Sequence, residues 1–193
     1  YDFGGFSPEL YKIVYAAPGD PDLAAEVAQL TGAQLEQARG WDHGLWVPLK
    51  NLRPQANIPI VELSLPVGAT PAELMSIGKK LAPLRDRNVM IAGSGGIVHN
   101  LGRINLAAKF ADVDPWAREF DEFIADTLER RDFDAITNYQ TRGPNASLAV
   151  PTPEHFEPLL VLLGAASDRD RTHVIHEGIT YGNLSMRTFA LRE

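Results

Sequence analysis

The stretch Val89-Met90-Ile91-Ala92-Gly93-Ser94-Gly95-Gly96-Ile97-Val98-His99-Asn100 decides the fold class of this 193-residue chain. An apolar run of strand length breaks into glycines and then presents a histidine and an asparagine. Such a run is typical of a buried strand, and in open α/β sheets ligands bind in the loop beyond the carboxyl end of a strand. A phosphate-binding loop is a weaker interpretation, because the glycine spacing does not complete G-x-G-x-x-G and no lysine follows as in a P-loop.

Helical and strand-like patterns alternate along the rest of the chain. We expect helices at 21–31 (capped by Asp20), 70–85 and 115–131, and strands at 58–65, 89–92, 174–177 and 184–191. Segment 135–150 shows no periodicity and is expected to form a loop over the site. The alternation predicts an α/β fold with three layers, in which helices flank a parallel or mixed central sheet, and a single domain over residues 1–193.

Composition narrows the class of partner. The net charge of −7 argues against nucleic acid, because phosphate binding needs a basic face. The chain has no cysteine, which excludes disulfides, thiolate zinc sites and cysteine nucleophiles and leaves imidazole and carboxylate as metal ligands. No apolar run approaches the roughly 20 residues of a membrane span. We therefore expect a cytoplasmic enzyme with a small-molecule partner, no nucleic acid and no membrane; self-association into a homo-oligomer is left open.

The segment Pro151-Thr152-Pro153-Glu154-His155 predicts a helix start that carries a candidate metal ligand. Thr152 is a suitable cap and Pro153 suits the first helical position, so His155 is expected in the first turn. There the helix dipole disfavours the imidazolium and favours the neutral ring that binds metals. On a helix, Glu154 would point about 100° away from His155. The alternative is a histidine that only forms hydrogen bonds at a helix start.

Two further histidine settings are informative. His43 lies in Gly40-Trp41-Asp42-His43-Gly44-Leu45-Trp46, between two tryptophans and beside a glycine that allows close approach. Such a site suits proton transfer by an imidazole, although a turn histidine packed on aromatic rings, with Asp42 as a helix cap, explains the pattern equally well. His173 and His176 fall in a strand-like segment, where one is expected to face solvent, and neither receives a role.

These motifs, together with Asp2-Phe3-Gly4-Gly5-Phe6, Pro158-Leu159-Leu160 and Asn183-Leu184-Ser185-Met186, resemble the class III extradiol ring-cleavage dioxygenases. The most similar group is the 4,5-DOPA dioxygenase type. The resemblance runs through the whole chain in the order and spacing of the family. It implies a non-haem metal-dependent enzyme that opens a catechol-type ring with O₂.

The resemblance also implies roles for individual residues. His155 would be a metal ligand and His43 the acid/base residue. His99 would lie close to the metal, either as a ligand or as a hydrogen-bonding group for substrate and dioxygen. The metal would be Fe(II), with Zn(II) possible in the same site, because an iron held on one face leaves positions for catecholate and dioxygen. Arg142 and Asn145 are candidates to contact a carboxylate or catechol oxygen, although a solvated loop explains them more simply.

One departure from the family pattern concerns the amino terminus. Members of this group begin with two further strands, each of which supplies a metal-binding histidine, and the sequence that opens at Tyr1 lacks both. We therefore expect the 193 residues to represent the carboxyl-terminal three-quarters or so of such a protein and not to hold iron or zinc tightly alone. Two other classes stay open: a non-catalytic metal-binding relative, and a zinc-dependent hydrolase in which histidine ligands and an imidazole base activate water.

Overall fold

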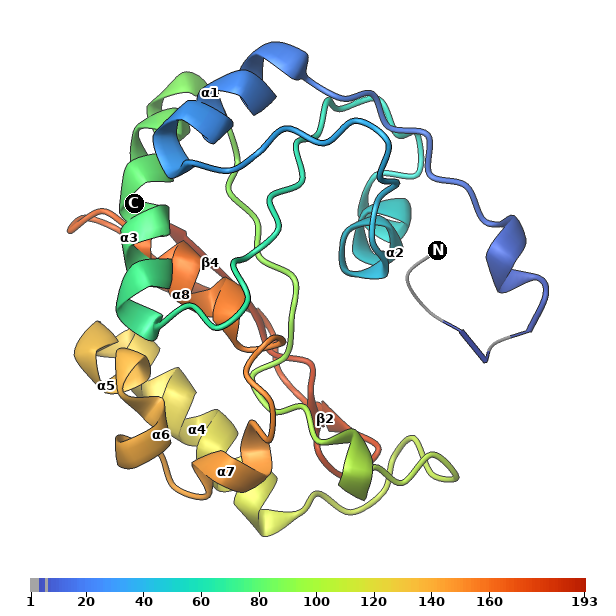
Figure 1. Cartoon of the computed structure of the whole chain (residues 1–193). Coiled ribbons are helices and arrows are strands. Elements are labelled where there is room, and N and C mark those ends of the chain that lie inside the picture. The colour runs from blue at the N-terminus through green and yellow to red at the C-terminus, as the bar shows by residue number, and fades with distance from the viewer. Residues whose placement is uncertain (1–3, 6) are drawn as a thin grey trace. The chain divides into compact units, whose positions relative to one another are not determined.

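The computed structural model describes residues 4–5 and 7–193, which divide into two compact units, one up to Ser64 and one from Leu65 onward (Figure 1). Of the motif at residues 2–6, only the two glycines lie within the described residues. No helix among the described residues is long and apolar enough to cross a membrane. The prediction of a single domain over the chain stays a prediction.

The first unit contains η1 (Leu10–Lys12), α1 (Pro21–Thr31) and α2 (His43–Leu52). The predicted helix at 21–31 is confirmed: the Asp20 carboxylate accepts the Leu23 N–H at 3.0 Å, and Gly32 ends the helix with a left-handed φ of 85°. An acidic cap and a glycine stop are local signals, so the bounds of this helix follow from the sequence alone.

The second unit is mostly helical and ends in short antiparallel strands. Its elements are α3 (Pro71–Leu81), η2 (Ala82–Arg87), η3 (Leu101–Arg103), α4 (Pro115–Glu129), α5 (Phe133–Thr137), α6 (Tyr139–Arg142), α7 (Ala146–Ala149), α8 (Glu157–Gly164), β1 (Arg171–His176), β2 (Ile179–Thr180), β3 (Leu184–Ser185) and β4 (Thr188–Arg192). β1 pairs with β4 and β2 with β3, both antiparallel, with an irregularity in the first pair between Val174 and His176. Helices and strands together are compatible with the α/β class.

The expected central sheet is not assembled by the described residues. Segment 58–65 is extended but forms a single parallel bridge, between Gly19 and Ile60, and segment 89–92 is not assigned to a strand. Met90 in the second segment is 82% exposed. Apolar, β-branched sequence favours extended backbone, but a sheet also needs neighbouring strands, and pairing is not encoded locally.

Helices α3 and α8 cross at two glycines and lie side by side in Figure 1. A Cβ on Gly78 would come within 2.0 Å of the Val161 carbonyl oxygen, and a Cβ on Gly164 within 2.1 Å of the Met75 carbonyl oxygen. The backbones therefore approach more closely than any larger side chain allows. Most residues of α8 are apolar and buried, as expected for a helix enclosed on all sides.

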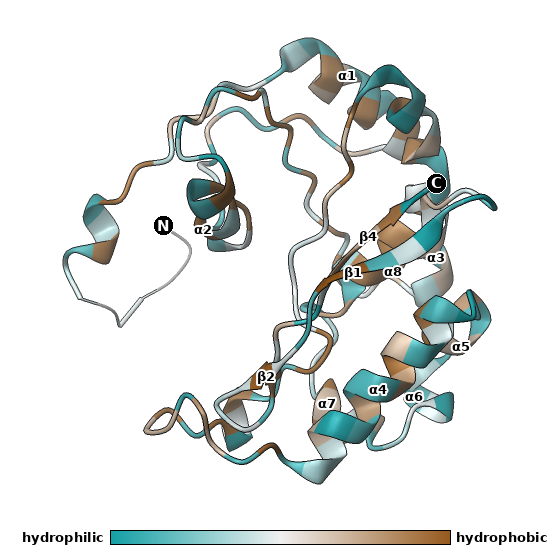
Figure 2. Cartoon of the chain, turned by 180° about the vertical axis from the view of Figure 1, so that it is seen from behind, coloured by the Kyte–Doolittle hydropathy of each residue, from teal (hydrophilic) through white to brown (hydrophobic). Residues whose placement is uncertain are grey.

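Helix α4 is amphipathic, with hydrophobic and hydrophilic residues alternating along its turns (Figure 2), and its buried face contributes to an aromatic cluster. Phe120 and Leu128 on this face are buried, whereas Trp116 and Phe123 are half-buried. The Phe120 ring lies 6.3 Å from Tyr139 and 6.1 Å from Phe156, and the last two rings lie 4.3 Å apart, measured between centroids. Offset and edge-on contacts of this kind stabilise a core beyond simple area burial. The cluster joins α4, α6 and the residue just before α8.

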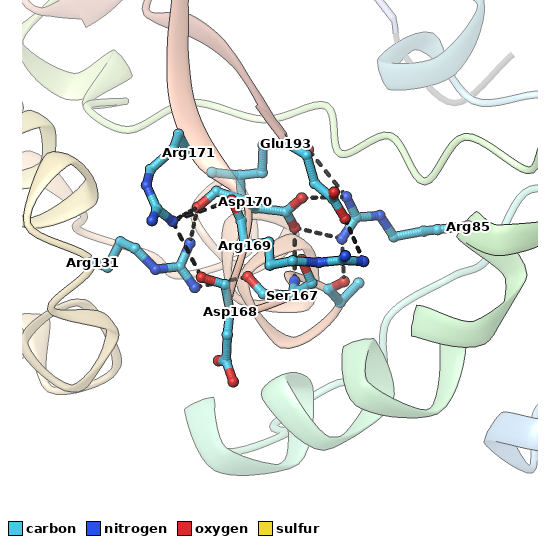
Figure 3. A network of polar contacts seen from close by, with 10 residues as sticks. Arg85, Arg131, Ser167, Asp168, Arg169, Asp170, Arg171 and Glu193 are labelled. Carbon is cyan, nitrogen blue, oxygen red and sulfur yellow. Dashed lines mark hydrogen bonds and ion pairs between the residues drawn. The ribbon is translucent and has the colours of Figure 1, made fainter.

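Buried Asp170, which directly precedes β1, links the carboxyl-terminal strands to the helices of the second unit (Figure 3). The Arg85 guanidinium donates to both Asp170 carboxylate oxygens, at 2.6 and 2.8 Å, and also to the Ala165 carbonyl. The hydrogen bonds from Arg85 hold the pKa of Asp170 below its ordinary value. The Ser167 N–H donates to the same carboxylate at 2.7 Å. A bidentate contact of this type fixes the relative orientation of the guanidinium and the carboxylate as well as their distance.

We predict that Gly78→Ala destabilises the protein. Alanine is about 1 kcal/mol better than glycine in an open helix, but here the added methyl group meets backbone atoms of α8 that cannot rotate away. We expect a net loss of about 1–3 kcal/mol in the free energy of unfolding, as for an overpacked core. Chemical denaturation measures it. The control is Gly40→Ala, because a Cβ at position 40 meets nothing within 4 Å, and this change should leave the free energy of unfolding nearly unchanged. A Gly78→Ala protein more stable than the wild type would contradict the close helix crossing.

Candidate functional site

His99 is held at the end of the glycine-rich loop by hydrogen bonds on both sides. Its N–H donates to the Ala149 carbonyl at 3.0 Å, and the Asn100 side-chain amide donates to the Leu148 carbonyl at 2.8 Å. The preceding residue, Val98, is fully buried. The backbone of His99 is therefore fixed while its imidazole remains partly exposed.

The prediction that His155 occupies the first turn of a helix is wrong. Helix α8 begins at Glu157, with Phe156 in the cap position, and residues 151–156 form bends and turns. Two interactions compete with the helix: the Thr152 hydroxyl is 2.6 Å from the Glu154 carboxylate, to which it donates, and the Phe156 ring is buried in the aromatic cluster. Thr152 therefore makes no cap bond to α8. Burial of Phe156 anchors the residue next to His155.

A backbone hydrogen bond joins the two histidine loops. The Gly96 N–H donates to the His155 carbonyl at 2.8 Å. The contact requires glycine at position 95, because a Cβ there would lie 2.1 Å from the His155 carbonyl oxygen. The imidazoles of His99 and His155 consequently stack with their ring centroids 3.7 Å apart and an interplanar angle of 33°. The structure thus brings together the two residues that the sequence predicted as metal ligands.

The electrostatic setting favours neutral imidazole at His99. Burial, and then the neighbouring His155, lower the pKa of His99 below its ordinary value. A neutral ring is the form that coordinates metals. Two imidazoles at this distance repel each other when both are protonated, which favours the neutral form of His99.

Glu154 lies nearer to His155 than a helix would have placed it. Its Oε1 is 3.9 Å from His155 Nε2, which corrects the expectation that this carboxylate points away. The hydrogen bond from Thr152 is the main cause that lowers the pKa of Glu154. With 58% of the Glu154 side chain and 35% of the His155 side chain exposed, the ion pair itself contributes little stability.

The side chains around His99 and His155 determine whether this part of the chain can hold a metal ion. Within residues 4–5 and 7–193, no group of three or more His, Asp or Glu side chains is arranged to hold one. His99 and His155 nevertheless supply two adjacent imidazoles, a donor type that suits iron and zinc. The described residues therefore fit part of an imidazole-bound metal site.

A buried ion pair supports the His99 loop from behind. The Ser185 N–H donates to the Val98 carbonyl at 3.1 Å, and the Ser185 hydroxyl donates to Asp121 at 2.6 Å. Arg187 donates to the other Asp121 oxygen at 2.6 Å, and each of these two side chains is only 7% exposed. The chain of contacts from α4 to β3 thus ends one residue before His99.

His43 belongs to the first unit, where it is the first residue of α2 and is exposed. Asp42 caps this helix, as predicted: its carboxylate accepts the Leu45 N–H at 3.0 Å. Trp46 is buried one turn further on and anchors the helix. The local structure therefore presents the imidazole at a helix start that is fixed by a cap and an aromatic side chain.

The remaining candidates have structural partners. Segment 135–150 is not a loop, because it contains the end of α5 and the whole of α6 and α7. Arg142 pairs with Asp134 at 2.7 Å, and the Asn145 side chain donates to Glu119 at 2.7 Å. Short helices held by such side-chain contacts show no hydrophobic periodicity, which explains the error. In β1, His176 is exposed and His173 is half-buried.

Sequence reasoning missed Glu62. This carboxylate lies in the apolar run 58–65 and accepts the Asp42 N–H at 3.3 Å. Burial is the first cause that raises its pKa, to about 7, and the second is a hydrogen bond with the Asp42 side chain. A glutamate inside an apolar run is the signal that could have found it.

Comparison with known proteins places the chain in a family. Residues 1–189 match the family model described as the catalytic LigB subunit of aromatic ring-opening dioxygenase. The chain is 36% identical to the 4,5-DOPA dioxygenase extradiol of Portulaca grandiflora, over 98% of this chain and 72% of that protein, and 37% identical to the protein of that name from Escherichia coli K12, over 96% and 70%. The crystal structure of an uncharacterized Escherichia coli K12 protein superposes with a TM-score of 0.84 at 35% identity, covering 93% of this chain and 76% of that one.

The described helices and short antiparallel strands are compatible with the α/β class, and they bring two imidazoles together. The chain belongs to the LigB family of aromatic ring-opening dioxygenases, the class III extradiol enzymes, as its motifs predicted.

We predict that Asp121→Asn weakens both the fold and the site. Removing the Asp121 charge leaves the buried Arg187 guanidinium with only the exposed Glu177 carboxylate, 2.6 Å away, as counter-charge. We expect a loss of about 3 kcal/mol in the free energy of unfolding, the low end of the cost of breaking a buried ion pair. Denaturation measures this loss, and faster amide exchange at His99 would show that it reaches the site. Glu122→Gln on the exposed face of the same helix is the matched control and should change neither. Equal stability of the two variants would contradict the supporting role of the pair.

Proposed function

We propose that the protein is a non-haem, metal-dependent extradiol dioxygenase that opens a catechol-type aromatic ring with O₂. The observation that carries the proposal is the stacked pair His99 and His155, 3.7 Å apart, in a chain of the aromatic ring-opening dioxygenase family. A lone histidine is not a site, but two imidazoles brought together from distant segments by a backbone hydrogen bond are a built arrangement.

The metal that we propose is Fe(II), held through His99 and His155. Imidazole nitrogen suits both iron and zinc, and the reaction with dioxygen favours iron. When bound, the ion supplies the positions at which an aromatic diol and dioxygen can react. The lowered pKa of His99 supports ligation, because the ring need not lose a proton first.

His43 is the acid/base residue of this proposal. Ring opening requires that a catechol hydroxyl lose its proton and that a proton return as the O–O bond breaks, and one imidazole can perform both transfers. The exposure of His43 at the capped start of α2 supports the role, because the ring is accessible to a substrate and its backbone is fixed. Both oxygen atoms of O₂ remain in the ring-opened product.

The substrate that we propose is a catechol of the DOPA type. The support is the name shared by relatives 36–38% identical to this chain, 4,5-DOPA dioxygenase extradiol. We also keep the three-layer arrangement as a proposal, with the extended segments 58–65 and 89–92 as strands of a central sheet. The TM-score of 0.84 with a related crystal structure supports it.

The direct experiment loads the full-length protein, with any segment that its gene encodes before Tyr1, with Fe(II) under anaerobic conditions and then adds catechol or DOPA with O₂. A yellow ring-opened product, formed with consumption of one O₂ per substrate, is the expected result. Absence of product and of O₂ uptake with every catechol offered would contradict the function. The same assay with zinc-loaded protein distinguishes the metal.

We predict that His99→Ala and His155→Ala each reduce metal affinity by at least about tenfold. Replacing a residue that only hydrogen-bonds to a metal ligand already costs about that much, and replacing a ligand should cost no less. Metal analysis after dialysis and titration with Fe(II) or Co(II) measure the change. His176→Ala, which removes an exposed imidazole from β1, is the control and should bind as the wild type does. A metal-replete His155→Ala protein would reverse the assignment.

We predict that His43→Gln leaves metal content unchanged and lowers turnover by roughly 10²-fold or more, the usual contribution of a positioned acid or base. Metal analysis and steady-state kinetics on the same preparation separate the two effects. Loss of metal from this variant would show that His43 is a ligand and not a base.

A further inference from the structure

A second carboxyl group lies beside the turn that presents His43. Glu62 comes from a segment twenty residues further along the chain, and its Oε1 accepts the backbone N–H of Asp42 at 3.3 Å. The Asp42 carboxylate in turn caps α2 through the Leu45 N–H at 3.0 Å. His43 follows this cap as the first residue of α2, so Glu62 contacts the chain neighbour of the proposed acid/base residue.

The two carboxyl groups are close enough to share a hydrogen bond, and only a protonated carboxyl can donate it. Two carboxylates that share a site cannot both ionise easily. Burial, then the hydrogen bond with the Asp42 side chain and the Asp42 charge, together raise the pKa of Glu62 to about 7, against the backbone N–H of Asp42 and the nearby Arg39, which lower it. Asp42 and Arg39 are the charged groups of the described residues that act on Glu62. At neutral pH the pair therefore changes charge.

We propose that Glu62 holds a proton shared with Asp42 and thereby sets the charge next to His43, as a positioning residue for proton transfer. The inference rests on the proposed function through the role of His43. With the proton in place the pair carries one negative charge, and without it two. A negative charge that appears beside an imidazole favours proton uptake by that ring, so the state of Glu62 determines how readily the base accepts and returns a proton.

A purely structural role for Glu62 predicts something different. As an acceptor for the Asp42 N–H, Glu62 would act equally well when replaced by glutamine, whose carbonyl oxygen accepts the same hydrogen bond. Glutamine cannot titrate. Glu62→Gln therefore retains the hydrogen bond and keeps the side chain neutral at every pH, as the protonated carboxyl is. Glu36→Gln, an exposed change in the preceding loop, is the matched control.

The first measurement is thermal unfolding from about pH 5 to 8, which needs no substrate. A pKa raised from the ordinary 4.5 to about 7 means that the native state binds the proton more tightly than the unfolded chain. The stability contributed is therefore present below about pH 4.5 and lost as pH rises through about 7. The Tm of wild type minus that of Glu62→Gln should fall across this range, and the difference for Glu36→Gln should stay constant. A pH-independent difference for Glu62→Gln would overturn the shared proton.

The second measurement is the pH profile of kcat/KM for the iron-loaded enzyme. The ratio of kcat/KM at pH 8 to that at pH 6 should differ between wild type and Glu62→Gln by roughly threefold or more, because a unit charge gained by the pair that precedes His43 changes the energy of proton transfer by at least about RT. Metal content should be unchanged. Asp42→Asn retains a cap and should move the ionisation of Glu62 to lower pH. Identical pH profiles for wild type and Glu62→Gln would overturn the proposal. If the wild-type enzyme opens no catechol, the proposed function fails. Thermal unfolding then still decides whether Glu62 holds the proton.

Discussion

The hydrogen bond from the Gly96 N–H to the His155 carbonyl is the contact on which the site depends. It joins two segments that are about sixty residues apart, and it forms only because position 95 has no Cβ to strike the same carbonyl. With the backbones joined, the imidazoles of His99 and His155 lie with their ring centroids 3.7 Å apart. The chemistry proposed for this protein follows from that enforced proximity rather than from either histidine alone.

Packing on both sides keeps this contact in place. Behind His155, the buried Phe156 ring joins the aromatic cluster, and α8 is pressed against α3 through Gly78 and Gly164. Behind His99, the buried pair of Asp121 and Arg187 holds Ser185 against the loop. Core packing and one desolvated ion pair thus position two side chains that themselves remain partly exposed, which is the usual division between scaffold and functional residues.

Local features of the second unit and of α1 could be predicted from the sequence, and long-range contacts could not. The Asp20 cap and the periodicity of α4 depend on neighbouring residues, so both helices were predicted correctly. The start of α8 was wrong because Thr152 bonds Glu154 and Phe156 is drawn into the aromatic cluster. His99 and His155 were recognisable as candidates from their settings. Their approach, the pairing of extended segment 58–65 and the role of Glu62 depend on residues distant in sequence.

Amide hydrogen exchange at Gly96, followed by NMR in the native protein, tests the joined loops most directly. The account predicts that the Gly96 and His99 amides, which donate to His155 and Ala149, exchange more slowly than the amide of exposed Ser94 in the same loop. Gly95→Ala should abolish the protection at Gly96. Exchange at Gly96 as fast as at Ser94 in the wild type would contradict the claim that a backbone hydrogen bond brings the two histidines together.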